Sequence, residues 1–235
     1  MPRRRRARVN GSTAGSPSRA RAPHGQRPAC YRCFKPKATC ICASIEIVDN
    51  KTGVIVLQHP HERFHPIGTA RIAQLGLARV RVEPCTPWAD HSAIAARFPD
   101  RTALLYPAAD ARDLCSIAVD ERPHHLVVID GTWFHAKKIY DAHPWLGALP
   151  HVSLAPPMPS LFRGVRRQPK APFGAHAAVL CISTLEAIVQ ALGILEPETT
   201  GLDRLLTSFS AMVERQASRT PGRALARTIV CPPMP

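Results

Sequence analysis

The stretch His125-Leu-Val-Val-Ile-Asp-Gly-Thr-Trp133 is the strongest indication of the fold in this chain. Residues 126–129 are apolar and mostly β-branched, which predicts a strand of a parallel sheet with both faces buried. The composition of residues 134–141 then predicts a helix. Because ligands of open α/β sheets bind at the carboxyl ends of the strands, the carboxylate, glycine and indole between these elements mark a candidate site. The alternative is a tight turn in which Asp130 caps the helix and Trp133 fills the core.

Short apolar runs alternate with helical stretches along the rest of the chain, and this order predicts an α/β protein with a mostly parallel sheet flanked by helices. The predicted strands are residues 53–58, 80–82, 103–106, 126–129 and 152–154, and the predicted helices are residues 69–78, 92–98, 134–141, 184–193 and 203–218. The sequence has no glycine-rich phosphate-binding motif, which argues against nicotinamide chemistry and nucleotide hydrolysis. No apolar run approaches the roughly 20 residues that span a bilayer, so we expect no membrane partner.

The chain is strongly basic, with a formal net charge of +14 over 235 residues. Residues 1–29 hold eight arginines, no acidic residue and few large apolar groups. This composition predicts a disordered arm that binds a polyanion, since each neutralised phosphate releases counterions. A solvated tail without function is the alternative. No apolar segment of the secretory kind follows the arginines, so we expect a cytoplasmic protein.

A cysteine module occupies residues 30–44. Its four cysteines have the spacing C-x2-C-x6-C-x-C and are Cys30, Cys33, Cys40 and Cys42. Two close pairs of thiolates separated by a short loop suit Zn²⁺ in a reducing compartment, and four such ligands leave no open position, so we predict a structural zinc knuckle. The residues between the ligands also predict a basic surface that faces RNA. They are Tyr31, Arg32, Lys35 and Lys37.

Three histidines crowd the loop after the first predicted strand: His59, His61 and His65. Pro60 and Pro66 exclude a regular helix here, so no two of these imidazoles share one helical face as metal ligands. We therefore predict a polar loop that contacts substrate rather than a metal site.

Two more segments are placed where a ligand could bind, one at the end of a predicted strand and one at the start of a predicted helix. Pro107 ends the strand at residues 103–106, and the small Ala108 lets a ligand approach the backbone. Ser183 and Glu186 form a capping-box pattern at the start of a helix. A capped helix start also offers backbone N–H groups to a carboxylate ligand, so the structural and functional interpretations are compatible.

Residues 163–170 contain four cations and no acid: Arg163, Arg166, Arg167 and Lys170. This pattern predicts a strip that contacts phosphates, with a solvated basic loop as the alternative.

Together these motifs resemble the DTW-domain family of tRNA-uridine aminocarboxypropyltransferases. The matching segments, in chain order, are the four-cysteine knuckle, Gln58-His-Pro-x-Glu62, Leu105-Tyr-Pro107, Asp130-Gly-Thr-Trp133, Arg166-Arg-Gln-Pro169 and Ser183-Thr-Leu-Glu-Ala187. They span about residues 30–193. The chain departs from the family at Gly68-Thr69, where the family commonly has Asn-Thr.

The resemblance implies a SPOUT-like fold, in which the chain forms a knot and S-adenosylmethionine lies among the knot loops. It implies a disordered tail over residues 1–29, a zinc knuckle over 30–44, a catalytic domain over 45–220 and a C-terminal tail over 221–235. The implied reaction moves the 3-amino-3-carboxypropyl group of S-adenosylmethionine to N3 of a uridine in tRNA. The products are acp3U and methylthioadenosine.

The resemblance also implies roles for individual residues. Asp130 is the expected base that removes or shares the N3 proton, with Thr132 and Trp133 beside it in the catalytic centre. The residues expected to bind S-adenosylmethionine are Tyr106, Pro107, Ala108, Asp130, Ser183, Thr184 and Glu186. Those expected to bind RNA are Arg163, Arg166, Arg167 and Lys170.

Two other readings stay open at this stage. The first keeps the fold and S-adenosylmethionine but changes the RNA or the transferred group. It is an aminocarboxypropyltransferase that acts on ribosomal RNA, or an RNA methyltransferase. The second is a non-catalytic zinc protein that binds RNA through its tail and knuckle. The oligomeric state is open in all of them.

Overall fold

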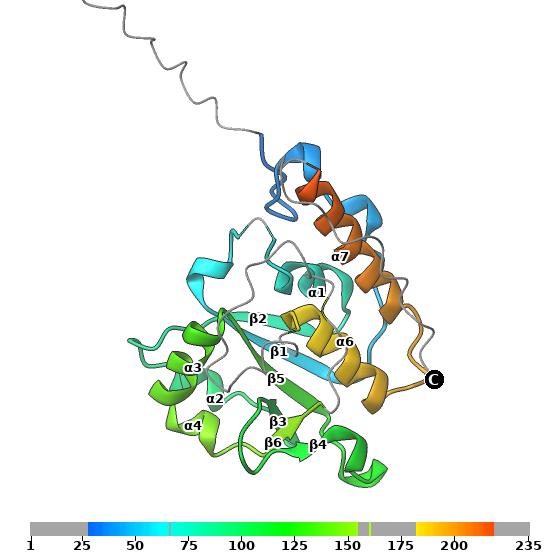
Figure 1. Ribbon diagram of the computed structural model, residues 1–235. Helices are drawn as coiled ribbons and strands as arrows, with labels where there is room; N and C mark the ends of the chain where they lie inside the picture. Colours follow the sequence, from blue (N-terminus) through cyan, green and yellow to red (C-terminus); the bar gives the residue numbers. More distant parts are fainter. Residues whose placement is uncertain (1–27, 66, 155–159, 161–181, 219–235) are drawn as a thin grey trace, which may run out of the picture.

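A six-stranded sheet forms the centre of the molecule (Figure 1). The computed structural model describes residues 28–65, 67–154, 160 and 182–218. The strands are β1 (Gly53–Gln58), β2 (Val80–Pro84), β3 (Thr102–Leu105), β4 (Arg112–Asp113), β5 (His125–Asp130) and β6 (His151–Ser153), and their order in the sheet is β2-β1-β5-β3-β6-β4. Every pairing is parallel, which confirms the predicted α/β class.

Helices cover both faces of this sheet (Figure 1). They are α1 (Ala70–Gly76), α2 (Ser92–Ala95), α3 (Trp133–Ala142), α4 (Pro144–Gly147), α6 (Thr184–Leu195) and α7 (Leu202–Ala217). Val54 and Val56 of β1 pack with α1, α6 and α7, whereas Ile55 and Leu57 pack with α2, α3 and α4. Since successive side chains of a strand point to opposite faces, two apolar layers require a continuous apolar run, as the sequence has.

The predicted strands and helices are all present, with their ends shifted by a few residues. The expected helix over residues 92–98 ends at Ala95. Phe98 precedes Pro99, and a residue before proline avoids the helical conformation. The sequence pattern does not predict β4 or the one-turn helix α4. β4 consists of Arg112 and Asp113, which pair with β6 at the edge of the sheet and carry no apolar signal.

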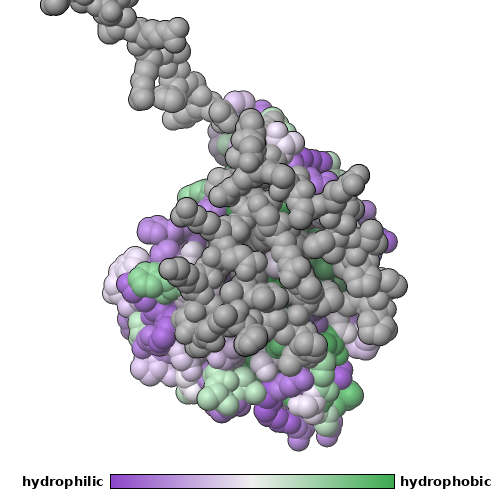
Figure 2. All heavy atoms as spheres, in the orientation of Figure 1, coloured by the Kyte–Doolittle hydropathy of each residue, from purple (hydrophilic) through white to green (hydrophobic). Residues whose placement is uncertain are grey.

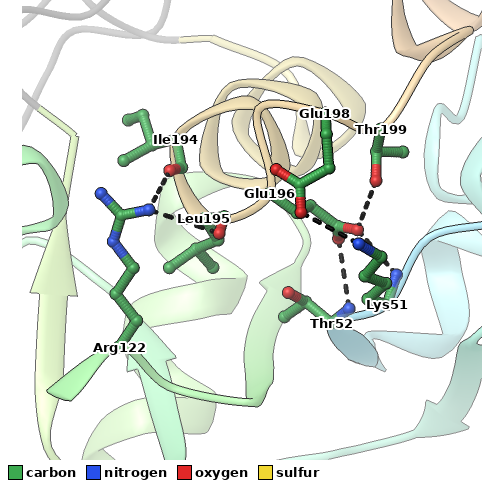
Figure 3. Close-up of polar contacts among 8 residues, drawn as sticks. All are labelled: Lys51, Thr52, Arg122, Ile194, Leu195, Glu196, Glu198 and Thr199. Carbon is green, nitrogen blue, oxygen red and sulfur yellow. Dashed lines mark hydrogen bonds and ion pairs between the residues drawn. The ribbon is translucent and has the colours of Figure 1, made fainter. Parts of the chain in front are cut away.

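The carboxyl end of α6 is tied to the start of β1 and to Arg122 (Figure 3). The buried Glu196 carboxylate accepts hydrogen bonds from the backbone N–H groups of Lys51 and Thr52, at 2.7 and 3.2 Å. The Thr199 hydroxyl donates a third bond at 2.6 Å. Arg122 Nη1 donates to carbonyl oxygens in the last turn of the helix, the shorter bond being 2.8 Å. These contacts fix the axis of α6, and so the place of its amino end.

The cysteine module lies beside α7, away from the sheet (Figure 1). It contains two short 3₁₀ helices, Lys37–Thr39 and Cys42–Ser44. Arg215 Nη1 of α7 donates to the carbonyl oxygen of Cys40 at 2.8 Å, and the Ser208 hydroxyl donates to the carbonyl of Ser44. The module is therefore held by the helix that ends the described chain.

Several predicted features fall outside the described residues. Residues 155–159 and 161–181 connect β6 to α6, so the predicted knot stays a prediction. The predicted tails over residues 1–29 and 221–235 also lie outside the described residues, except for residues 28 and 29. There the predicted disorder is wrong, because Ala29 forms an antiparallel bridge with Pro36. Among the described helices, none has the length and apolar character to cross a membrane. Hydrophilic and hydrophobic residues are interspersed over the coloured part of the surface in Figure 2.

Candidate active site and cysteine cluster

The carboxyl ends of three adjacent strands bring the predicted site together. β5 lies between β1 and β3 in the sheet, and Gln58 pairs with Asp130 in the register of β1 and β5. β3 ends at Leu105, so Tyr106 leaves the sheet beside them. Three separate sequence motifs thus meet at one edge, as expected for an open α/β sheet.

Asp130 is the centre of this arrangement. Its side chain is buried, and Gln58 Nε2 donates to Oδ2 at 2.8 Å. The Thr184 hydroxyl donates to Oδ1 at 2.6 Å. The two oxygens therefore accept from neutral donors on two other elements, which fixes the plane of the carboxylate. A carboxylate held in this way is a positioned hydrogen-bond acceptor and a candidate base.

The turn after Asp130 shows that this residue is not the helix cap. Thr132 is the N-cap of α3, and its hydroxyl accepts a hydrogen bond from the His135 N–H at 3.3 Å. Trp133 is the first residue of α3 and is half-buried. A Cβ added at Gly131 would lie 3.1 Å from Cβ of His135, so the turn favours a glycine. The capping role proposed for Asp130 is wrong, because Thr132 fills it.

The predicted capping box at the start of α6 is confirmed. The Ser183 hydroxyl accepts from the Glu186 N–H at 3.2 Å, while Glu186 Oε2 accepts from the Ser183 N–H at 2.6 Å. The Ser160 hydroxyl donates to the same Oε2 at 2.9 Å. Ser183 and Glu186 are both buried and shape the helix end. Thr184, between them in sequence, is the residue that contacts Asp130.

Tyr106 lines the β3 side of the strand ends. It is buried and its ring stacks on Tyr140 of α3, with ring centroids 4.4 Å apart. Burial raises the pKa of the Tyr106 hydroxyl above its usual value, so the ring carries no charge at neutral pH. Pro107 is exposed and Ala108 is half-buried. Tyr106 and Ala108 pack on the α3 face of the sheet, whereas the Asp130 carboxylate bonds to α6 on the other face.

Histidines gather next to Asp130, and sequence reasoning missed one of them. The backbone N–H of His59 donates to the backbone carbonyl of Asp130 at 2.9 Å. The His59 ring stacks on the His135 ring, with ring centroids 4.0 Å apart and an angle of 4° between the planes. Nitrogens of these two rings and of His61 lie within 4.8 Å of one another. A metal ion must lie in the plane of each imidazole that binds it, and two parallel planes share no such point. The prediction of a polar loop therefore fits this geometry better than a metal site does.

The four cysteines of the knuckle form one cluster. The Sγ atoms of Cys30, Cys33, Cys40 and Cys42 all lie within 4.8 Å of one another. Backbone N–H groups of Cys33 and Arg32 lower the pKa of Cys30 to about 6, whereas burial raises the pKa of Cys42. Four sulfur ligands that converge in this way fit a tetrahedral Zn²⁺.

Lys35 was predicted to lie on the basic surface of the knuckle, but it does not face solvent. Its side chain is buried, and Nζ donates to the carbonyl oxygens of His65 and Gly68 at 3.3 and 3.2 Å. Burial lowers the pKa of Lys35 to about 8. The lysine thus ties the knuckle to the loop after β1, and the prediction that it faces RNA is wrong. The predicted RNA-binding residues between 163 and 170 lie outside the described residues.

Comparison with known proteins agrees with the geometry of this site. A model of the DTW domain matches residues 27–217, which is most of the chain. The chain belongs to the DTW-domain family. The match includes the cysteine cluster and all three strand ends described above, so the resemblance seen in the short motifs extends over the whole described fold.

Relatives of this DTW-domain protein carry a common name. The chain is 34% identical over 194 residues to tRNA-uridine aminocarboxypropyltransferase 2 of Drosophila melanogaster, covering 74% of this chain and 69% of that protein. It is 27% identical over 227 residues to tRNA-uridine aminocarboxypropyltransferase A of Arabidopsis thaliana, covering 83% of each chain. It is 28% identical over 208 residues to the mouse protein named tRNA-uridine aminocarboxypropyltransferase 2, covering 81% of this chain and 64% of that protein. No solved structure gives a significant match.

Proposed function

We propose that this DTW-domain protein transfers the 3-amino-3-carboxypropyl group of S-adenosylmethionine to N3 of a uridine in tRNA. The observation that carries the proposal is the buried Asp130, held by Gln58 and Thr184 where three strands end. The names of the relatives support the reaction and the tRNA substrate. The products are acp3U and methylthioadenosine.

The bond changes explain which residue types the site needs. The bond between Cγ and the sulfonium sulfur breaks, its electron pair stays on sulfur, and methylthioadenosine leaves as a neutral thioether. A bond forms between Cγ and N3 of uracil, and the N3 proton leaves. The sulfonium is already a good leaving group, so the protein must align Cγ with N3 and accept that proton. Asp130 accepts the proton or orients the imide through a hydrogen bond.

Other strand-end residues bind the donor in this proposal. Tyr106, Pro107 and Ala108 line the adenosine side, because they follow β3 directly next to the end of β5. The amino end of α6 around Ser183 and Thr184 offers N–H donors to the donor's carboxylate. The residues after β3 and the amino end of α6 thus lie on either side of Asp130, the proposed base.

Three further residues have supporting roles: Thr132, Trp133 and Glu186. Trp133 packs beside the donor or fixes the turn after β5. Thr132 and Glu186 act through helix starts. The Thr132 hydroxyl accepts from the His135 N–H of α3, and the Glu186 carboxylate accepts from the N–H of Ser183, the N-cap of α6. They are positioning residues for Trp133 and Thr184.

The zinc and RNA-binding parts complete the proposal. Cys30, Cys33, Cys40 and Cys42 hold a structural Zn²⁺, because four thiolates close the coordination shell and leave no position for substrate. The basic segment over residues 163–170 and the arginine-rich segment over residues 1–29 contact tRNA phosphates, in line with the net charge of +14.

Mass spectrometry of nucleosides tests the reaction directly. Unmodified tRNA is incubated with the protein and S-adenosylmethionine, then digested and analysed. We expect an acp3U peak that disappears with Asp130→Asn, which keeps the side chain's size. A methylated nucleoside would overturn the transfer chemistry and indicate a methyltransferase. Binding of tRNA with no product from a correctly folded protein would favour the non-catalytic RNA-binding reading, and product on ribosomal RNA alone would change the substrate.

A further inference from the structure

Phe34 has a backbone conformation that bulky residues avoid. Its φ is +57°, in the left-handed region, directly after the second cysteine of the knuckle. Glycine and asparagine adopt this region with little cost, whereas an aromatic residue is strained there. Phe34 is also half-buried and belongs to none of the core clusters among the described residues. Packing in the core therefore does not account for a phenylalanine at this position.

The ring of Phe34 forms part of a surface shared by two segments. It lies edge-to-face with Phe64 of the loop after β1, with centroids 5.1 Å apart. The Arg71 guanidinium of α1 lies over the Phe34 ring at 4.3 Å, and the Arg63 guanidinium lies over the Phe64 ring at 5.2 Å. The strained conformation thus aims the ring at aromatic and cationic neighbours.

Hydrogen bonds hold the two segments in one fixed arrangement. Lys35 Nζ donates from the knuckle to carbonyl oxygens of the loop after β1, as described above. Arg71 Nε donates to the Arg32 carbonyl at 2.8 Å, which joins α1 to the knuckle. The surface is therefore preorganised, and a ligand would not need to order it.

The surface remains open to solvent although it carries large aromatic rings. The exposed fraction is 62% for Phe64 and 90% for Tyr31, which lies on the same knuckle. Arg32 and Arg63 are exposed as well. We define the aromatic-basic surface as Tyr31, Arg32, Phe34, Arg63, Phe64 and Arg71. It contains three aromatic rings, three guanidinium groups and no acid.

We propose that the aromatic-basic surface binds unpaired nucleotides of the tRNA substrate, with bases stacked on the rings and phosphates bound by the arginines. The inference rests on the proposed function for the identity of the RNA. Stacking on aromatic rings combined with a positive surface is how proteins bind single-stranded nucleic acid. The loop that carries Phe64 begins at His59, whose N–H bonds to the carbonyl of Asp130. The surface therefore binds nucleotides near the target uridine.

Phe34→Gly is the sharpest test because it separates folding from binding. Glycine relieves the backbone strain, so we expect a melting temperature equal to or above that of the wild type. We expect the Kd for unmodified tRNA, measured by fluorescence anisotropy at fixed salt, to rise about tenfold, as for the loss of a stacked base. Phe64→Ala should have a similar effect. Val119→Ala is the matched control, since Val119 is 75% exposed but lies near β4 at the far edge of the sheet.

The charged part of the surface has its own test. Arg63→Ala should lower the slope of log Kd against log salt by about one, the value for one lost phosphate contact. Arg112→Ala, which removes an exposed arginine beside Glu121, should leave that slope unchanged. Ultraviolet cross-linking of 4-thiouridine-containing tRNA should give adducts on the peptides that contain Tyr31 or Phe64.

The outcomes separate this inference from the proposed reaction. If acp3U forms and the Phe34→Gly and Phe64→Ala proteins bind tRNA like the wild type, the surface inference is wrong and the reaction stands. If no acp3U forms but these variants bind tRNA more weakly, the reaction is wrong and the surface stands. A large drop in the melting temperature of Phe34→Gly would mean that the ring supports the fold, and would overturn the inference.

Discussion

Two buried carboxylates near opposite ends of α6 illustrate two uses of the same chemical group. Asp130, near the amino end, is held by side chains of Gln58 and Thr184. Glu196, at the carboxyl end, is held by two backbone N–H groups and the Thr199 hydroxyl. Backbone donors that the fold would otherwise leave unpaired make a carboxylate a structural tie. Side-chain donors instead aim a carboxylate, so we expect Asp130 to matter for activity and Glu196 for stability.

The largest effect expected from this comparison is on the rate of transfer. Asp130→Asn should lower the rate of acp3U formation by about 10²–10⁴-fold, because the amide cannot accept the N3 proton. The melting temperature should change less than for Glu196→Gln, because the Gln58 amide and the Thr184 hydroxyl can turn to accept from the new amide, whereas backbone N–H groups cannot. Initial rates from nucleoside mass spectrometry give the first value and thermal unfolding the second. Asp141→Asn, which removes an exposed ion pair with Lys137, is the control. Full activity of Asp130→Asn would remove the base from the mechanism.

The matching change at the other end should reverse this pattern. Glu196→Gln should lower the free energy of unfolding by about 2 kcal/mol, since hydrogen bonds to a charged group are lost or weakened. Chemical denaturation measures this loss. Glu198→Gln is a close control, because Glu198 is exposed and its ion pair with Lys51 contributes little. Equal stability of the two variants would contradict the structural role of Glu196.

A smaller effect is expected when Asp130 itself is kept and only one hydrogen bond that orients its carboxylate is removed. Thr184→Val removes one donor to the carboxylate and should reduce the transfer rate about tenfold, the worth of one hydrogen bond. Loss of that donor also frees the carboxylate to turn away from the imide proton. Thr184→Ser keeps the hydroxyl and should restore the wild-type rate. A wild-type rate for Thr184→Val would mean that Asp130 does not need this donor.

The smallest effect concerns the stability of the strand-end region at low pH. Burial, and then the neighbouring His135 and His61, lower the pKa of His59. The unfolded chain therefore binds a proton at His59 more readily than the folded chain does. Neutral His59 contributes its full stability above the unfolded pKa, and this contribution is lost as the pH falls through the lower folded pKa. His59→Asn should lose less stability than the wild type between pH 7 and pH 5 in denaturation experiments. An unchanged pH dependence would show that the folded and unfolded chains protonate His59 equally, so that burial does not lower its pKa.

Hydrophobic pattern predicted the fold better than it predicted side-chain direction. The apolar run of β5 and the Asp-Gly turn marked the sheet and the position of Asp130, and the Ser183/Glu186 spacing marked the start of α6. The Gln58–Asp130 contact depends on the register of two strands far apart in sequence, which no local pattern contains. Lys35 was misplaced because composition gives no sign of a buried lysine that bonds to carbonyls. His135 escaped notice because only the stacking on His59 gives it a place in the site.

The sequence separation of the contacts in the two candidate sites has a consequence for how the protein is made. Cys30 and Cys42 meet across 12 residues, whereas Asp130 contacts partners 72 and 54 residues away. Local contacts form early and at low entropic cost, while distant ones await the chain that supplies them. The cysteine cluster can therefore close while the ribosome is still synthesising the sheet. The Asp130 site needs the chain as far as Thr184, so a nascent chain could complete the four-thiol cluster well before it could assemble the strand-end site.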